Sequence, residues 1–152
     1  MLDKTDYAII AALQVNGRLT NIELAETVNL SPSPCLRRVK KLEEAGIITG
    51  YHAEVDERAY GLPLTIFVRV TLERHNKAVI ARFEDAIREM EEVMECHLLT
   101  GSADYLLKLL VKDLLDYERF MREEMHEIPG IASIDTSFAL VAVKKKRRFG
   151  RV

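Results

Sequence analysis

The chain opens with apolar residues at helical spacing. Between residues 3 and 15 the apolar side chains fall on one helical face, Asp3 is suited to cap the helix start, and Asn16-Gly17 ends the run. The pattern predicts a first helix with an apolar stripe of Ile9, Ile10 and Leu13.

A shorter helical segment follows a capping signature. Thr20 and Glu23 match a capping box, in which the hydroxyl and the carboxylate each accept a hydrogen bond from an otherwise unpaired backbone N–H. The sequence therefore predicts a short second helix with an apolar stripe of Leu24, Ala25 and Val28.

The third helical segment begins with two overlapping start signals. Ser31-Pro32 and Ser33-Pro34 each place a serine, a favoured N-cap, before a proline at the first helical position, where its missing N–H costs little. The helix is expected to end near Ala45, with Gly46 closing it. Along it, before the first acid at Glu43, lie the basic residues Arg37, Arg38, Lys40 and Lys41.

A short capped helix, a tight turn and a basic helix together predict a helix-turn-helix. In that motif the second helix lies with its N-terminal part in the major groove, where Lys and Arg neutralise phosphates and Arg also pairs with guanine. A solvated amphipathic helix is the alternative interpretation, and the two serines are favoured as caps over base contacts. The candidate DNA-contacting residues are Thr20, Asn21, Ser31, Pro32, Ser33, Pro34, Arg37, Arg38, Lys40 and Lys41.

The second half of the chain alternates strand and helix patterns in the order β-α-β-β-α-β. Residues 64–73 alternate apolar and polar side chains, whereas the two helical segments repeat apolar residues every three or four positions. This order predicts a ferredoxin-like domain with both helices on one face of a four-stranded antiparallel sheet. The expected strands are 64–73, 93–100, 105–111 and 131–143, and the expected helices follow Asn76 and Asp113, the second reaching Ile128.

Strand 105–111 carries apolar side chains on both faces of the expected sheet. Leu107 and Leu109 point to one face, and Leu106 and Leu110 to the other. Because the helices cover only one face, the second face is expected to meet a partner, and self-association about a two-fold axis is the commonest solution.

The chain is therefore expected to be an α+β protein with an N-terminal winged helix-turn-helix and a ferredoxin-like βαββαβ domain. Residues 47–55 have strand-like content, and residues 56–63 carry the turn residues of a linker. We assign residues 1–50 to the helix-turn-helix domain, 51–63 to a strand and linker, 64–143 to the ferredoxin-like domain, which would bind the effector and oligomerise, and 144–152 to a basic tail.

The net charge of −2 is unevenly spread along the chain. Residues 1–50 hold six basic and six acidic side chains, and residues 51–143 hold ten and eighteen. The tail from Lys144 to Arg151 holds six basic and no acidic side chains. Such a tail is typical of a disordered solvated end, which we favour, or of weak attraction to a nucleic-acid backbone.

The residue pattern predicts neither catalysis nor a metal site. The four histidines are scattered, without a cysteine or carboxylate at a spacing typical of metal ligands or a nucleophile pair. Cys35 and Cys96 show no disulfide framework or zinc motif and fit a reducing cytosol. Because no apolar run spans a bilayer and no signal peptide is apparent, we expect a cytoplasmic protein with no membrane partner, metal or cofactor, which is not an enzyme.

An RNA-binding sheet is an alternative that shares this order of strands and helices. Such sheets stack bases on aromatic side chains of their central strands. The third strand here offers only Tyr105, and the domain is net acidic, so the pattern disfavours RNA binding.

Several motifs in order resemble the Lrp/AsnC family of transcriptional regulators, and the resemblance covers nearly the whole chain. They begin with Leu2-Asp3-Lys4-Thr5-Asp6 and Asn16-Gly17-Arg18. The resemblance implies DNA binding by the third helix, a homodimer formed through the C-terminal sheets, further assembly into an octamer-like ring of dimers, and binding of a free amino acid between dimers. The other matching motifs are Leu24-Ala25, Ser31-Pro-Ser-Pro-Cys-Leu-Arg-Arg38, Lys41-Leu-Glu-Glu-Ala-Gly-Ile47, Leu99-Thr-Gly101 with Asp104-Tyr105, and Ile128-Pro-Gly130.

The amino-acid site of that family corresponds here to the turn after residue 99. An α-amino acid needs an anion for its ammonium group and backbone N–H groups for its carboxylate, which Asp104 and the Gly101 turn are suited to supply. A plain hairpin, with glycine for a positive φ, is the alternative interpretation. The effector residues implied by the resemblance are Thr100, Gly101, Ser102, Asp104, Tyr105, Thr136 and Ser137.

Together these inferences favour a sequence-specific regulator of transcription that binds double-stranded DNA and whose assembly or DNA binding responds to a free amino acid. The alternative is an amino-acid-sensing oligomeric module that acts on protein partners without binding DNA itself. The basic third helix favours the regulator.

Overall fold

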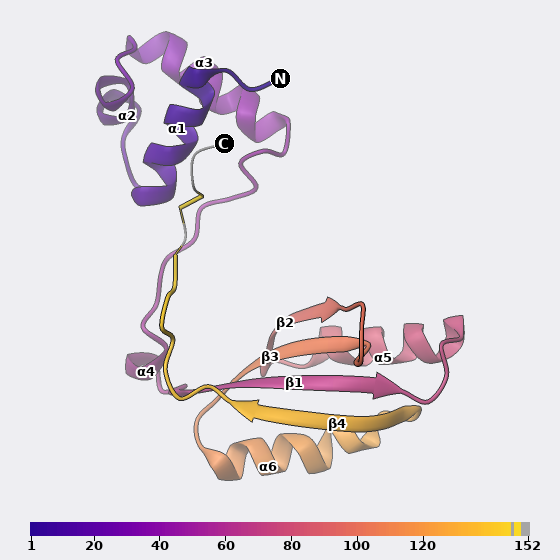
Figure 1. Ribbon diagram of the computed structural model, residues 1–152. Coiled ribbons are helices and arrows are strands. Elements are labelled where there is room, and N and C mark those ends of the chain that lie inside the picture. Colours follow the sequence, from indigo (N-terminus) through magenta and orange to yellow (C-terminus); the bar gives the residue numbers. More distant parts are fainter. Residues whose placement is uncertain (147, 150–152) are drawn as a thin grey trace. The chain divides into compact units, whose positions relative to one another are not determined.

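The computed structural model describes residues 1–146 and 148–149. The chain divides into two compact units (Figure 1). Each unit has its own hydrophobic core. Unit 1 holds Met1–Glu54 together with the C-terminal segment from Val143, and unit 2 holds Val55–Ala142. The division falls inside the segment 51–63, which the sequence analysis assigned to a linker.

The described residues of unit 1 form three helices, two of which begin with the predicted capping boxes. At the first, Asp3 accepts hydrogen bonds from the backbone N–H groups of Thr5 and Asp6, and Asp6 accepts the Asp3 N–H. At the second, Glu23 donates its N–H to the Thr20 hydroxyl and accepts the Thr20 N–H. The helices are α1 (Lys4–Val15), α2 (Asn21–Thr27) and α3 (Pro32–Glu44).

The start of α3 differs from the prediction that serine side chains cap it. Ser31 occupies the N-cap position, but its side chain makes no capping hydrogen bond. Ser33 is no cap, because the helix already begins at Pro32 and places Ser33 in its first turn. Proline at the first helical position, with its fixed φ, marks this helix start.

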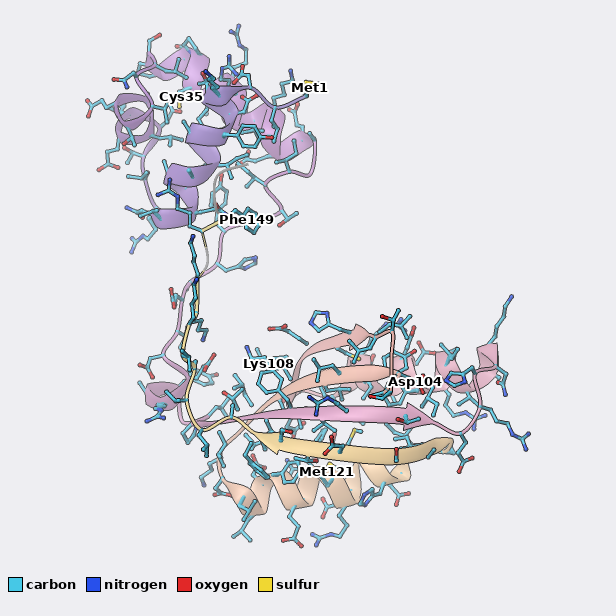
Figure 2. All side chains as sticks on the ribbon, in the orientation of Figure 1. Met1, Cys35, Asp104, Lys108, Met121 and Phe149 are labelled. Carbon is cyan, nitrogen blue, oxygen red and sulfur yellow. The ribbon has the colours of Figure 1, made fainter. Side chains whose placement is uncertain are left out.

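Buried residues from all three helices form the core of unit 1. Ile9 of α1 and Cys35 of α3 are fully buried, and Figure 2 shows Cys35 among these helices. Leu24 and Ala25 of α2 and Leu42 of α3 complete the cluster. The apolar stripes predicted for the three helices therefore meet in one core.

Residues 47–55 form no strand, contrary to the prediction. Every β-ladder in the described part of the chain belongs to the sheet of unit 2, so this segment has no neighbouring strand for its backbone groups. The Tyr51 hydroxyl instead donates to the Glu43 carboxylate of α3 at 2.9 Å. Farther along, Asp56 caps a single helical turn, α4 (Glu57–Tyr60), where only a linker was expected.

Unit 2 contains a four-stranded antiparallel sheet in the order β2-β3-β1-β4, which is the ferredoxin-like arrangement. β4 ends at Phe138, short of the predicted end at Val143. The Ala139 N–H still donates to the Thr65 carbonyl at 3.0 Å, but β1 begins at Leu64 and offers no further partner. The strands are β1 (Leu64–Leu72), β2 (Val93–Leu98), β3 (Tyr105–Val111) and β4 (Ile131–Phe138).

Both long helices of unit 2 cover the same face of the sheet, as predicted. Phe83 of α5 and Phe120 of α6 are fully buried in one cluster with Val68 of β1 and Leu107 of β3. The predicted continuation of the last helix to Ile128 is instead a separate 3₁₀ turn. The helices are α5 (Lys77–Glu89), capped by Asn76, α6 (Leu114–Glu123), capped by Asp113, and η1 (Met125–Glu127).

The second face of the sheet is less open than its sequence pattern indicated. Leu110 is only 5% exposed, so the single chain already buries it. Phe67 and Leu106, on the same face, remain partly exposed. An apolar area is therefore available on this face, but it is smaller than the alternation alone predicts.

Two global features concern the class of protein. Among the described residues, no helix combines the length and the apolar composition needed to cross a membrane. Both cysteines are free: Cys35 is buried in the core of unit 1, and Cys96 is exposed on β2.

Candidate nucleic-acid interface and effector loop

One face of α3 is basic and open to solvent. Its side chains line a shallow surface hollow of about 390 Å³. The opposite side of the helix is anchored by the buried residues Cys35 and Leu42. Leu36 is 44% exposed among the cations, which suits an apolar contact with a thymine methyl, while arginine and lysine suit guanine and phosphate. The hollow is lined by Ser33, Leu36, Arg37, Lys40, Lys41 and Glu44.

Arg38 is held by α1, although it follows Arg37 directly. Its Nη1 donates to the carboxylates of Asp3 and Asp6, both at 2.7 Å. These two hydrogen bonds raise the pKa of Arg38. The pKa of Asp3 is lowered, first by the hydrogen bond from the Asp6 backbone and then by Arg38. Arg37 therefore lines the open face, whereas Arg38 braces α3 against the start of α1.

Thr20 and Asn21 hold α2 in place. The Thr20 hydroxyl donates to the Glu23 carboxylate at 2.8 Å, and Asn21 Nδ2 donates to the Pro32 carbonyl at 2.8 Å. The Asn21 Oδ1 atom is buried and has no hydrogen-bond partner among the described residues. The Asn21 side chain thus fixes the start of α3 relative to α2, a role that the sequence did not reveal because its partner is a backbone carbonyl.

The first turn of α3 is mostly open to solvent. Ser31, Pro32 and Ser33 are exposed, and Pro34 is partly buried beside the core residue Cys35. The exposed serine hydroxyls therefore remain accessible from outside the unit.

The turn between β2 and β3 is fastened to the end of β1 by Asp104 (Figure 2). Its carboxylate accepts the Leu72 N–H and bonds His75 Nε2, each at 2.7 Å. Its own N–H donates to the Val70 carbonyl at 2.9 Å. The Leu72 N–H, followed by His75, lowers the pKa of Asp104. The carboxylate is therefore ionised at neutral pH, and it holds the turn through Leu72 and His75, which lie outside the hairpin.

Residues 100–102, shortly before this anchor, form an exposed loop. Gly101 has a φ of 124°, which agrees with the prediction that glycine supplies a positive φ here. Thr100 and Ser102 flank it and are also exposed. Among the described residues no group of three or more His, Cys, Asp or Glu side chains is placed to hold a metal ion. The loop thus offers backbone and hydroxyl groups beside one carboxylate.

Three other predicted effector residues have different surroundings. The buried Tyr105 hydroxyl donates to Glu84 of α5 at 2.8 Å, and burial together with this bond raises the pKa of Tyr105 to about 12. The Thr136 hydroxyl lies 2.6 Å from that of Tyr117 of α6. Ser137, as the next residue on β4, faces the opposite side of the sheet. In the single chain, the Tyr105 and Thr136 side chains therefore bond helix residues instead of the loop, and Ser137 lies on the other face of the sheet from Thr136.

Two family models match most of the chain. Residues 2–49 match a winged helix-turn-helix DNA-binding model, and residues 65–149 match the Lrp/AsnC ligand binding domain. The chain belongs to the Lrp/AsnC family. The first match covers the three helices of unit 1, and the second begins at the first strand of unit 2.

Relatives of this Lrp/AsnC protein match it along most of their length. It is 44% identical over 142 residues to the Bkd operon transcriptional regulator of Pseudomonas aeruginosa, covering 93% of each chain. It is 40% identical over 147 residues to the leucine-responsive regulatory protein of Klebsiella pneumoniae, covering 97% of this chain and 90% of the relative.

A solved structure matches the fold as well. A transcriptional regulator of Neisseria meningitidis, determined as an L-Met complex, aligns with a TM-score of 0.94 at 41% identity, covering 99% of this chain and 97% of that one. As a member of the Lrp/AsnC family, the protein is a DNA-binding regulator of transcription and not an enzyme. The predicted family, fold class and functional class are confirmed.

Proposed function

We propose that this regulator reads its operator with the open face of α3 and that a free amino acid controls it through the Thr100–Asp104 loop. The observation that carries the first part is the α3 face itself, where Arg37, Lys40 and Lys41 surround the exposed Leu36. Ser33 adds a hydroxyl at its N-terminal end. Arg38, Thr20 and Asn21 support this face through contacts inside unit 1.

The test of DNA reading compares two arginines in the full chain. Gel-shift titrations use a duplex from the protein's own upstream region and a random duplex of equal length. Arg37→Ala is expected to weaken operator binding about 10- to 100-fold, the loss typical of a base-contacting arginine. Arg122→Ala, an exposed arginine on α6, is the control and is expected to bind like the wild type. Equal operator affinity of wild type and Arg37→Ala would contradict the proposal.

The effector site rests on the loop geometry and on a relative that was solved with L-Met. The loop combines an ionised carboxylate at Asp104, the unusual backbone of Gly101 and two hydroxyl groups. These are the groups that the ammonium and carboxylate of an amino acid require. The Asp104 side chain is 21% exposed, so its oxygens remain reachable although they already bond Leu72 and His75.

Thermal-shift measurements with the twenty amino acids, followed by calorimetry on the best of them, test this site. L-Met is the first ligand to try. Ser102→Ala is expected to keep the turn and reduce affinity, because only a hydroxyl is removed. Asp104→Ala is expected to abolish the amino-acid-dependent change in assembly while DNA binding persists. A normal response of both variants would place the pocket elsewhere.

Assembly is the third part of the proposal: a homodimer formed through the sheets of unit 2 that associates further into an octamer-like ring. It is supported by the partly exposed Phe67 and Leu106, which lie on the face that the helices leave uncovered. Leu106→Ser is expected to shift sedimentation toward smaller species, with circular dichroism checking the fold. Salt-independent or absent DNA binding combined with amino-acid binding would instead favour a sensing module that acts on protein partners.

A further inference from the structure

The described part of the basic tail, residues 144–146 and 148–149, belongs to the unit that carries α3. The described tail residues group with unit 1, and the Phe149 N–H donates to Gln14 Oε1 of α1 at 3.3 Å. Figure 2 shows Phe149 beside the helices of that unit. Gln14 belongs to the last turn of α1, just before the turn that leads to α2. The sequence analysis favoured a disordered end here; Arg147 and residues 150–152 lie outside the described part of the chain.

The tail decides the sign of the charge on unit 1. Residues 1–54 carry six basic and seven acidic side chains, and are therefore net acidic without the tail. The described tail residues Lys144, Lys145, Lys146 and Arg148 add four basic side chains and no acid. A DNA-binding unit that repelled the polyanion overall would lose both affinity and the rate advantage of electrostatic attraction. With these four cations the unit becomes net basic, with ten basic and seven acidic side chains among its described residues.

The charges on the α3 face do not replace this contribution. Glu44 lines the same hollow as Arg37 and Lys40, and Arg38 is already paired with two carboxylates. The tail cations Lys144, Lys146 and Arg148 are exposed. The side chain of Phe149 is 76% exposed as well, so the tail rests on the surface of unit 1 and is not buried in its core.

We propose that the described tail cations Lys144, Lys145, Lys146 and Arg148 form a second DNA-binding element, which contacts the phosphodiester backbone beside the operator positions read by α3. It adds affinity for any duplex and carries no sequence information, because phosphates are the same at every position. The inference rests on the proposed DNA reading by α3, and it adds a site that this reading does not require.

The test compares two variants of the full chain that each lose three positive charges. The tail variant is Lys144→Gln/Lys145→Gln/Lys146→Gln. The control, Lys77→Gln/Lys112→Gln/Arg122→Gln, removes exposed cations from unit 2. Fluorescence anisotropy measures binding to the operator duplex and to a random duplex between about 0.05 and 0.2 M salt.

In the tail variant, the plot of log affinity against log salt is expected to be less steep, with the magnitude of its slope reduced by about 1 to 3. At low salt, binding to both duplexes is expected to weaken by a similar factor of about ten or more. The control is expected to follow the wild type. Arginine in place of all three lysines is expected to restore the slope, which separates charge from any loss of folding. A wild-type slope in the tail variant, a loss confined to the operator, or no rescue by arginine would overturn the inference.

The same titrations separate the two proposals. Arg37→Ala is expected to lose operator affinity more than random affinity, whereas the tail variant loses both alike. If Arg37→Ala behaves as expected and the tail variant keeps the wild-type slope, only the tail inference fails. If the wild type shows no salt-dependent binding, DNA reading by α3 fails and the tail inference fails with it.

Discussion

Neighbouring side chains on α3 have separate tasks. Arg37 lines the open face, while Arg38 Nη1 bonds two carboxylates at the start of α1. Both arginines are basic residues of one helix, and only their partners distinguish them. A helix that reads DNA needs both kinds of residue, because a base contact discriminates only if the helix that carries it is held in place.

Arg38→Ala is expected to lower the melting temperature of unit 1, because Asp3 and Asp6 lose their shared cation and are left close together. Discrimination between operator and random DNA should change little, in contrast to the loss expected for Arg37→Ala. Differential scanning calorimetry beside gel-shift titration checks both effects. If Arg38→Ala instead abolished discrimination at an unchanged melting temperature, Arg38 would be a DNA contact.

Asp104 gives unit 2 a pH-dependent anchor. The folded pKa of Asp104 lies below its ordinary value, so the carboxylate stabilises the fold at neutral pH, and this contribution is lost as the pH falls below about 4. Asp104→Asn is therefore expected to be less stable than the wild type near neutral pH, with the difference shrinking in acid. Urea denaturation at several pH values measures it.

The matched control for that experiment is Asp135→Asn. The Asp135 side chain is 71% exposed, and its partner Arg69 is also well exposed, so removing this surface charge should have little effect at any pH. If Asp104→Asn lost the same amount of stability at every pH, the shape of the Asp104 side chain and not its charge would account for its role.

At the residue scale, sequence identifies side chains by type but not by partner. The basic stretch of α3 and the glycine of the turn were both predictable, because each reflects a local requirement of charge or φ. The bonds of Arg38 to Asp3 and of Asp104 to His75 join residues 35 and 29 positions apart. No spacing rule links such distant pairs, so the sequence did not reveal that His75 has Asp104 as its carboxylate partner.

At the scale of single elements, helix caps differ in how much they contribute. The Thr20 hydroxyl accepts the Glu23 N–H and completes a reciprocal pair, whereas the Ser31 side chain makes no such bond. Both residues are N-caps by position, and only the first satisfies an otherwise unpaired donor.

Thr20→Ala is thus expected to destabilise unit 1 by about 1 kcal/mol, the typical loss for an N-cap, while Ser31→Ala should be nearly neutral for stability. Chemical denaturation followed by helical circular dichroism compares the two. Equal losses would show that the Ser31 hydroxyl caps α3 in solution. A drop in DNA affinity without a drop in stability for Ser31→Ala would indicate a phosphate contact.

Elements with a strong internal pattern were predicted well, and those that depend on a neighbour were not. The helices and β1 follow from periodicity and capping residues that lie within the segments themselves. Residues 47–55 have strand-like composition but no adjacent strand, and β4 stops where β1 has no further residues to pair. A strand is a property of two segments, so one segment cannot specify it.

At the scale of the whole molecule, two cores share no residue. Ile9 is fully buried in the cluster of unit 1, and Leu107 is fully buried in that of unit 2. Each core is formed by the helices, or the helices and sheet, of its own unit. A destabilising substitution in one core is therefore expected to affect mainly the unit that contains it.

Ile9→Ala and Leu107→Ala are each expected to cost about 2 to 5 kcal/mol, the range for truncating a buried aliphatic side chain. Amide hydrogen exchange resolved by peptide is expected to show the loss of protection in unit 1 for the first variant and in unit 2 for the second. Uniform loss across both units in either variant would show that the units unfold together.

Unit 1 is made of two segments that are separated in the sequence by unit 2, and they are therefore synthesised at different times. Its helices leave the ribosome before unit 2, and residues 144–149 emerge only after unit 2. If the tail supplies the positive charge, a nascent or prematurely terminated chain displays a recognition helix on a net acidic unit. Such a chain would compete poorly for the operator against chains that already carry residues 144–149.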